Sequence, residues 1–508
     1  MSSIDAIVDV PALSEWLGLQ TMVAKDCLVT QLTDWTYHEQ RLHQLSAKCK
    51  RFKAAFEKDP TFFGKCHTLF QEIAQIEKQL NALVQNESKL EKESYNELLF
   101  MKPILQPLNF IPFLLPIWAV IRVYLLPGLS LLFPILILIA PYLILSFVFH
   151  IPITFTNYMN LLHSMISGNV QAVMDPQVAQ KLQKSISPVA FLKQFGVILA
   201  TCVQGIVQPY WSYKHLNSID DIIKENGRLV IRCKEIYMTL KELLLSHGFT
   251  MFACPLPEFS NERDAVARII LESSYFKMTL KYIGALEVVM SLANQEEIHP
   301  VRWVKSTKPT CIMKDTYDFQ VDKKKRKTIT VSFHNKSHAL LTGPNKGGKS
   351  TVLRAMACSA LLAHTYGCAF GKATMTPFRK LFVCLKPDDL PGSKSRFERE
   401  IEFTANTLTY KEPILVLIDE LYHSTNPPDA LRSCQIYTNQ LWKKPNVVSV
   451  ISTHLFELVE KSTNAIQHLC VPAKLDKEGT VEFMHVLRQG ICKISSVDLL
   501  LKSNGLLC

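Results

Sequence analysis

The sequence lacks the cysteine patterns of zinc sites and of disulfide-rich secreted domains. Its 14 cysteines are spread over 508 residues, without a Cys-x-x-Cys pair or a His/Cys cluster at zinc-ligand spacing. With only 18 glycines and no low-complexity tract, it is neither a fibrous nor a disordered chain. The first residues, MSSIDAIVDVPALSEWL, lack the basic start and apolar core of a signal peptide. These absences predict a globular protein with reduced thiols that faces the cytosol.

Charge of one sign dominates only slightly. The chain carries 56 Lys and Arg against 45 Asp and Glu, a net charge of +11. Such an excess suits nucleic acid or an anionic membrane surface as a partner, but over this length it does not select between them. The charged run at residues 322–327 (DKKKRK) predicts a solvated turn, with a nucleic-acid patch, a lipid-headgroup patch or a localisation signal as the alternatives.

A long apolar run is present from Leu108 to Pro152, and Arg122 is its only Lys, Arg, Asp or Glu. Since about 20 apolar residues cross a bilayer, the run has the length of two crossings. Pro127–Gly128 is the natural turn between them, so we expect a transmembrane helical hairpin. Lysines before the run favour a cytosolic location for that side. A re-entrant loop and a buried hairpin in a large core are the alternatives.

Hydrophobic periodicity and composition divide the chain into four regions. Residues 1–103 predict an N-terminal helical region, residues 104–152 the hairpin, and residues 153–300 a helical lever or core domain. The apolar segment Phe195–Trp211 is shorter than a span and favours a buried helix. In residues 301–508, short β-branched runs alternate with helices, which predicts an α/β domain around a largely parallel sheet.

Residues 343–350 match the phosphate-binding pattern G-x-x-x-x-G-K-[ST] in full, between an apolar strand and a helix. Backbone N–H groups of such a loop wrap phosphates, a lysine reaches the β- and γ-phosphates, and a hydroxyl holds Mg²⁺. We therefore expect ATP and Mg²⁺ as ligands. The nucleotide-binding candidates are Gly343, Pro344, Asn345, Lys346, Gly347, Gly348, Lys349, Ser350 and Thr351.

Two further strand ends carry candidate chemistry. An apolar strand ends in Asp419-Glu420, where Asp419 is a candidate Mg²⁺ ligand with Ser350, and Glu420 is a candidate base for the attacking water. The last strand ends in Ser452-Thr453-His454, and His454 is a candidate sensor of the γ-phosphate. The alternatives are that Asp419-Glu420 is an acidic pair on the surface and that His454 has only a structural role.

Together these segments resemble the MutS family of ABC-type ATPases. The family pattern TGPNMGGKST appears as residues 342–351 with Lys346 in place of Met, and THYFEL appears as residues 453–458. The signature pattern DDL-x-x-G-x-STF-x-x-E is echoed by Asp388-Asp389-Leu390, Ser395-Arg396-Phe397 and Glu400, and DE-x-GRGTS by residues 419–426. Residues 283–293 look like the lever helix that precedes the ATPase domain.

The resemblance implies ATP hydrolysis by a dimer of ATPase domains, formed with a second copy or with a related ATPase. Ser395 would then contact the partner's ATP in trans. The family's mismatch-reading domain has no counterpart in the residues before the apolar run. The sequence therefore predicts a shortened, membrane-anchored MutS-like ATPase, with its ATPase domain in the cytosol, whose closure moves helical levers. The alternative is a soluble cytoplasmic or nuclear protein that binds mismatched or branched DNA in repair or recombination.

Overall fold

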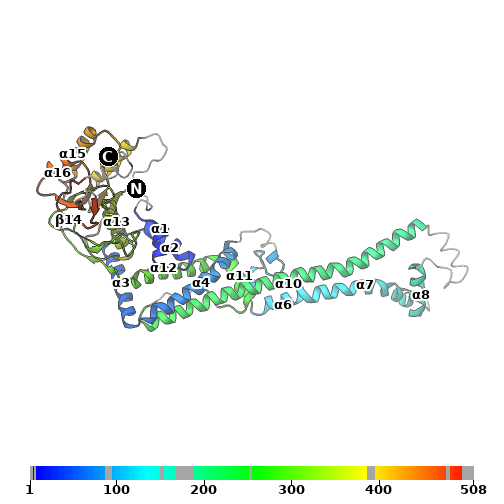
Figure 1. Cartoon of the computed structure of the whole chain (residues 1–508). Helices are drawn as coiled ribbons and strands as arrows, with labels where there is room; N and C mark the ends of the chain where they lie inside the picture. Colours follow the sequence, from blue (N-terminus) through cyan, green and yellow to red (C-terminus); the bar gives the residue numbers. More distant parts are fainter. Residues whose placement is uncertain are drawn as a thin grey trace. The chain divides into compact units, whose positions relative to one another are not determined.

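The computed structural model describes residues 4, 7–85, 94–148, 154–166, 188–250, 255–385, 395–475 and 481–494 (Figure 1). The chain folds into two compact units. Unit 1 comprises Met1–Gln75, Leu240–Met251 and Thr279–Cys508, and unit 2 comprises Ile76–Thr239 and Phe252–Met278. Both units draw on segments that are far apart in the sequence.

The N-terminal residues of unit 1 are helical, as the sequence predicts. The helices are α1 (Val10–Trp16), α2 (Met22–Thr33), α3 (Glu39–Lys58) and the first part of α4 (Thr61–Gln85). Thr21 caps α2 through its side chain and donates its hydroxyl over 2.6 Å to the buried carboxylate of Glu287. Glu287 lies on α12 (Ser273–Asn294), which contains the segment expected to be a lever helix. These bonds tie α2 to α12 within unit 1.

The C-terminal part of unit 1 is the predicted α/β domain. Its main sheet has the order β14-β11-β5-β10-β9-β8, and the five strands from β11 to β8 are mutually parallel. The strand bounds are β5 His338–Thr342, β8 Lys380–Cys384, β9 Ile414–Ile418, β10 Val447–Ser452, β11 Gln467–Cys470 and β14 Arg488–Gln489. Every residue of β5, β9 and β10 is buried, as expected for parallel strands covered on both faces.

Helices cover this sheet and supply its core. They are α13 (Lys349–Tyr366), α14 (Arg396–Thr409), α15 (Pro427–Leu441) and α16 (Phe456–Glu460). Smaller sheets flank it, in the orders β2-β7-β3-β4, β1-β6 and β12-β13. Their bounds are β1 Ile298–Pro300, β2 Arg302–Trp303, β3 Cys311–Thr316, β4 Ile329–Phe333, β6 Cys368–Phe370, β7 Lys372–Met375, β12 Ala473–Leu475 and β13 Val481–Phe483.

The regular elements among the described residues of unit 2 are helices. It contains the 3₁₀ helix η2 (Gln106–Phe110), α6 (Leu114–Val120), α7 (Leu126–Leu143), α8 (Phe155–Ile166) and α11 (Glu262–Leu271). It also takes most of α10 (Pro188–Ser246). On α10 the buried carboxylate of Asp220 accepts hydrogen bonds from Arg263 Nε at 2.7 Å and Nη2 at 2.8 Å. This bidentate pair joins α10 to α11.

The predicted turn at Pro127–Gly128 is wrong. Helix α6 continues through the π turn η3 (Ile121–Leu125) into α7 and then into the π turn η4 (Ile144–Val148), so residues 114–148 form one helix. Pro127 has no N–H to donate, and a π turn next to a proline rearranges the hydrogen bonds that it leaves open. Among the described residues one helix, Leu114–Leu132, is long and apolar enough to cross a membrane by length and composition.

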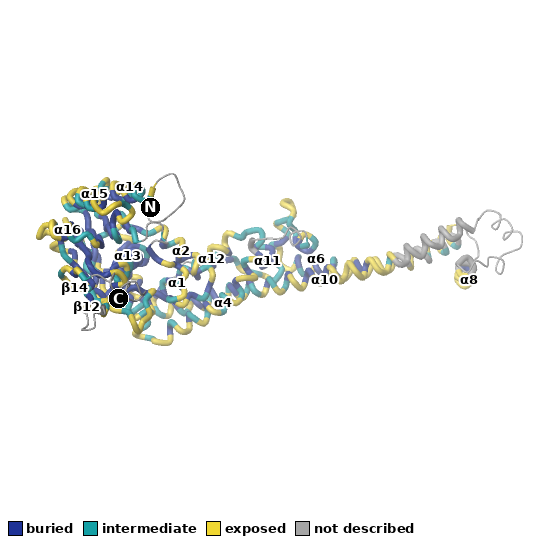
Figure 2. Tube along the Cα trace, turned by 45° about the horizontal axis from the view of Figure 1, so that its top comes forward, coloured by how far each residue is buried: buried dark blue, intermediate teal, exposed yellow. Residues whose placement is uncertain are grey.

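The segment Phe195–Trp211 is helical, as part of α10, but the expectation that it is buried fails where its side chains are described. Ile206, Val207, Tyr210 and Trp211 are exposed. In Figure 2 the described part of α10 beyond the α6 label is drawn largely in the colour of exposed residues. Length alone led to that expectation. A helix of this length is buried only where neighbouring elements cover it, and hydropathy does not report neighbours.

Candidate active site

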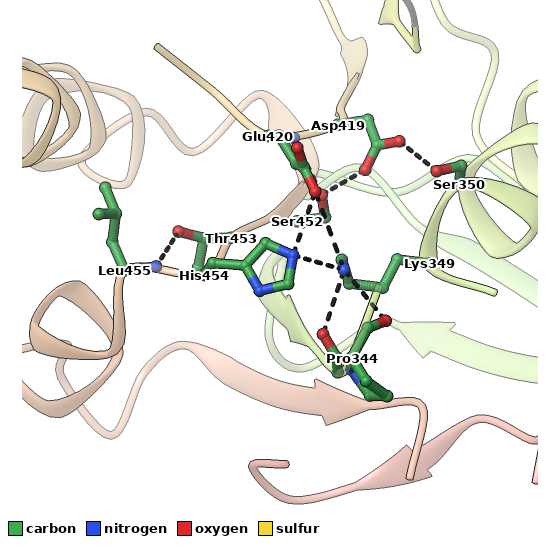
Figure 3. Close-up of polar contacts among 10 residues, drawn as sticks. Pro344, Lys349, Ser350, Asp419, Glu420, Ser452, Thr453, His454 and Leu455 are labelled. Atoms are coloured by element: carbon green, nitrogen blue, oxygen red, sulfur yellow. Dashed lines mark hydrogen bonds and ion pairs between the residues drawn. The ribbon is translucent and has the colours of Figure 1, made fainter. Parts of the chain in front are cut away.

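The candidate residues come together at one edge of the main sheet. Strand β10 lies between β5 and β9, and all three are parallel, so their C-terminal ends are adjacent. The loop after β5 is the phosphate-binding pattern, the loop after β9 begins with Asp419-Glu420, and the loop after β10 contains His454. Ligands of open α/β sheets bind at this edge of the strands. Figure 3 shows the side chains converging there.

Glycines shape the loop of residues 343–348. Gly343 has φ +150°, and a Cβ there would lie 2.7 Å from the carbonyl oxygen of Val471. Gly348 has φ +109° and is the residue from which α13 begins. A side chain at either position is strained, since L-residues rarely adopt these backbone angles. The loop therefore brings several backbone N–H groups and a helix N-terminus to one place, an arrangement that binds phosphate.

Lys349 is the buried cation of the site. Its Nζ donates to the carbonyl oxygens of Gly343 at 3.1 Å and Pro344 at 3.4 Å, and lies 2.8 Å from His454 Nε2. A carboxylate oxygen of Glu420 is 3.9 Å away. Burial lowers the pKa of Lys349, and the nearby carboxylates of Glu420 and Asp419 oppose that shift. A phosphate at the loop would favour the charged ammonium in the same way.

Asp419 lies between two serine hydroxyls. Ser350 donates to its Oδ2 and Ser452 donates to its Oδ1, and Ser452 Oγ also accepts the backbone N–H of Glu420 at 2.9 Å. Hard oxygen donors of this kind suit Mg²⁺, which is held by one or two protein oxygens together with water and phosphate. The Ser350 hydroxyl and the Asp419 carboxylate fit that ion.

Glu420 and His454 are joined by a hydrogen bond. Glu420 has φ +52°, an uncommon angle for a non-glycine residue, and its Oε1 lies 3.1 Å from His454 Nε2. That hydrogen bond lowers the pKa of Glu420, although burial opposes it. Glu420 is therefore ionised at neutral pH and able to accept a proton. His454 Nε2 also faces Lys349, so at any moment it either accepts from Lys349 or donates to Glu420.

A cavity of 280 Å³ lies beside the phosphate-binding loop, and the sequence analysis did not find it. Gly347, Gly348 and Thr351 line one wall, while the turn at residues 325–327 lines another. His485 has φ +50° and its Nδ1 lies 3.1 Å from the carbonyl oxygen of Gly347. His485 follows β13 and lies more than 100 residues beyond the phosphate-binding loop in the sequence, so no local sequence pattern predicts that it lines the cavity.

The charged run at residues 322–327 is a turn, but its arginine is not solvated. Asp322 Oδ1 accepts the backbone N–H of Lys324 at 2.8 Å, which closes the turn. Arg326 is buried, pairs with Glu297 at 2.5 Å and lies 3.7 Å above the ring of Tyr317. Tyr317 and Arg326 both line the cavity, so the run forms a wall of the site as well as a surface turn.

Ser395 is placed apart from these groups. It is the exposed N-cap of α14 and forms a capping box with Glu398. Within the described part of the chain, no hydrogen bond joins it to the phosphate-binding loop. The preceding Asp388-Asp389-Leu390 lies outside the described residues. The signature serine is therefore available on the surface of unit 1.

Residues 339–499 match the family model of MutS domain V. The match begins in β5 and contains the phosphate-binding loop, Ser395, Asp419, Glu420, His454 and His485. It supports membership of the MutS family and a P-loop type of ATPase domain. Tyr317 and Arg326, which close the cavity from outside this range, precede the matched residues.

One loop within the matched residues differs from the family pattern quoted above. Where that pattern has glycines after the Asp-Glu pair, this chain has Tyr422 and Ser424. Tyr422 adopts φ +56° and its hydroxyl lies 2.7 Å from Thr404 Oγ1, while Ser424 donates to Glu400 at 3.0 Å. Both partners are on α14, so the loop after Glu420 is bonded to the helix that starts at Ser395.

Proposed function

We propose that this chain is an ATP-binding and ATP-hydrolysing MutS-like protein of shortened form, anchored to a membrane. ATP-driven pairing of two ATPase domains would move the helical regions that carry the anchor. The observation that carries the enzymatic part is the convergence of Lys349, Asp419 and Glu420 on one phosphate-binding loop.

The site residues support a proposed position for each part of the nucleotide. The phosphates lie along the loop of residues 343–348 and the N-terminus of α13, with Lys349 at the β- and γ-phosphates. The base and ribose would fit the cavity that Tyr317, Arg326 and His485 line. Ser350 and Asp419 would hold Mg²⁺, which would neutralise charge on the phosphates. Glu420 orients water and takes its proton, and His454 contacts the γ-phosphate.

Pairing of two chains supplies the trans contact. Ser395 is exposed at the start of α14, where its hydroxyl can donate to the γ-phosphate of a nucleotide held by a second ATPase domain. A homodimer, or a heterodimer with a related ATPase, satisfies this geometry. Two serines in two chains would then close two sites together.

The membrane part rests on exposed apolar side chains in unit 2. Leu125 and several leucines of α7 are exposed within residues 125–148, a segment without Asp, Glu, Lys or Arg, and Ile206 and Trp211 of α10 are exposed as well. Large exposed apolar surfaces of soluble proteins mark interaction sites, and this one has the length of a bilayer crossing. The ATPase domain would face the cytosol, because ATP is there.

DNA is the alternative partner, favoured by the net charge of +11 and by the MutS domain. If several phosphates are engaged, binding weakens steeply with salt. A titration of branched and mismatched duplexes at two salt concentrations tests this, and no binding at low salt would remove the alternative.

Replacement of Glu420 tests the enzymatic proposal. Glu420→Gln keeps the loop, Lys349 and the Mg²⁺ ligands but removes the proton acceptor, so we expect ATP to bind and turnover to fall by about 100-fold or more. Glu412→Gln is the matched control, because Glu412 is exposed before β9 and away from the cluster. Both variants are assayed for nucleotide binding and for phosphate release. Unchanged turnover in Glu420→Gln would contradict the assigned role.

The membrane proposal has its own test. The full chain is mixed with sealed phospholipid vesicles and floated through a density gradient, before and after an alkaline carbonate wash. We expect the protein to float with the vesicles in both cases. Protein that stays at the bottom of the gradient without detergent would overturn membrane anchoring and leave the ATPase proposal intact.

A further inference from the structure

An aromatic cluster lies where α10 meets the helix of residues 114–148. The rings of Tyr124 and Tyr213 are 5.8 Å apart between centroids, and the Tyr124 hydroxyl donates to Asn217 at 3.2 Å. Tyr210 and Trp211 are beside them on α10, with exposed fractions of 58% and 59%. Lys214 Nζ lies 5.5 Å from the Trp211 ring. We call these four aromatic residues, Tyr124, Tyr210, Trp211 and Tyr213, the near cluster.

On α10 and on the helix of residues 114–148, the near cluster lies between a part that carries charged residues and a part that carries almost none. After it on α10 come Lys214, Asp220, Asp221 and Lys224, and before it on the other helix is the ion pair of Arg122 with Glu97 at 3.8 Å. In the opposite direction, residues 125–148 contain no Asp, Glu, Lys or Arg, and residues 188–210 of α10 contain only Lys193. The two helices therefore change character at the same level.

A second aromatic cluster lies at the other end of α7. Tyr142 contacts Phe155 and Tyr158 of α8, with ring centroids 5.4 and 5.5 Å apart. We call these three residues the far cluster. Tyr142 follows Tyr124 by 18 residues, which at the helical rise of about 1.5 Å per residue separates the clusters by about 27 Å. The hydrocarbon core of a bilayer is about 30 Å thick, and Trp and Tyr are enriched at both of its faces.

The exposed side chains between the clusters fit lipid better than a protein groove. Leu126, Leu129, Leu131 and Leu132 are all exposed. At about 100° per residue, these positions spread over more than half of the helix circumference. A helix that docks into a groove presents one apolar stripe and keeps polar residues on the opposite face. An apolar surface of this breadth suits acyl chains.

We infer that the near and far clusters mark the two faces of a bilayer, that Leu125–Leu143 crosses between them, and that α8 lies at the far face. The return crossing is the first part of α10, which has 23 residues from Pro188 to Tyr210. The crossing pair is thus residues 125–143 together with residues 188–210, rather than two halves of the apolar run. This inference rests on the proposed membrane anchoring and adds the depth of each residue.

An arginine scan of leucines measures that depth. Leu125, Leu129, Leu132, Leu136 and Leu143 are all exposed and are replaced singly by Arg in the full chain. The chain is synthesised with phospholipid vesicles, and the ratio of carbonate-resistant to soluble protein is measured. Because an arginine is most costly at the bilayer centre, we expect the ratio to fall roughly 100-fold for Leu132→Arg and Leu136→Arg. At Leu125 and Leu143, next to the clusters, we expect a fall of about 10-fold or less.

Ile222→Arg is the matched control, since Ile222 is 50% exposed and Leu132 is 49% exposed. Ile222 lies on the charged side of the near cluster, so its variant should insert as the wild type does. ATP binding in mild detergent shows that each variant is folded. If the wild type inserts and all five leucine variants insert equally well, or lose insertion steadily toward one end, the assignment of two faces is wrong while anchoring stands. A wild type that does not insert overturns both.

Discussion

Strand β9 and helix α7 both lack charged residues, but their environments are opposite. All five residues of β9, the sequence ILVLI, are buried between helices, whereas leucines and isoleucines of α7 are exposed along its length. Parallel strands are covered on both faces because the helices that connect them pack on those faces. A helix satisfies its own backbone, so an apolar helix can remain uncovered by protein when lipid replaces the cover. Hydropathy identifies the segments that are stable away from water, whereas topology decides whether protein or lipid covers them.

Truncation of one leucine in each region gives the largest contrast. Leu417 in β9 has no exposed surface, so Leu417→Ala leaves a cavity and we expect a loss of about 4 kcal/mol in the free energy of unfolding. Leu136 in α7 is exposed, so Leu136→Ala should change it by less than about 0.5 kcal/mol. Denaturant titration in mild detergent measures both. Similar losses would show that α7 is packed as a protein core.

The second prediction concerns charge within unit 2, on the part of α10 that follows the near cluster. Asp220 is buried, and although burial raises its pKa, the bonds from Arg263 and Lys224 bring the net shift below the ordinary value. Arg263→Met removes the bidentate partner and leaves a buried carboxylate, so we expect a loss of about 3 kcal/mol in unfolding free energy. The loss should shrink when Asp220 is replaced by Asn in the same chain.

Arg228→Met is the control for this pair. Arg228 lies on α10, as Asp220 does, and its side chain is 70% exposed and approaches Glu262 only to 3.9 Å. Exposed ion pairs contribute between nothing and about 1 kcal/mol, so its loss should be small. If Arg263→Met and Arg228→Met lower the free energy of unfolding equally, burial of Asp220 does not determine how much its ion pair stabilises the protein.

The sequence predicted best where the chemistry is local. The phosphate-binding loop, Asp419-Glu420 and His454 are short segments at strand ends, and the parallel order of β5, β10 and β9 brings them together. The helical N-terminal region and the α/β domain were also predictable, because their periodicities differ. The cavity beside the loop was not, because Tyr317 and His485 meet through tertiary folding alone. The turn at Pro127–Gly128 was wrong because a π turn lets the helix pass a proline.

The third prediction uses a histidine in the covered core. His364 on α13 is fully buried, with Nδ1 2.7 Å from the carbonyl oxygen of Ala360 and Nε2 accepting the backbone N–H of Phe378 at 2.9 Å. These partners require a neutral ring, and burial lowers the pKa of His364 to about 4. In the unfolded chain a histidine has a pKa of about 6.5. Between these values the unfolded state binds the extra proton, so stability is full above about pH 6.5 and falls as the pH drops toward 4.

From neutral pH to pH 5 we expect His364 to account for a loss of about 2 kcal/mol in the free energy of unfolding. His364→Gln keeps an acceptor for Phe378 without a titrating ring, so its unfolding free energy should depend less on pH in this range. His215→Gln on α10 is the control, because His215 is exposed and lies outside the covered core. Denaturant titrations at pH 7, 6 and 5 provide the slopes. A slope unchanged by His364→Gln would mean that the acid sensitivity of unit 1 arises elsewhere, and the buried neutral ring would lose its assigned effect.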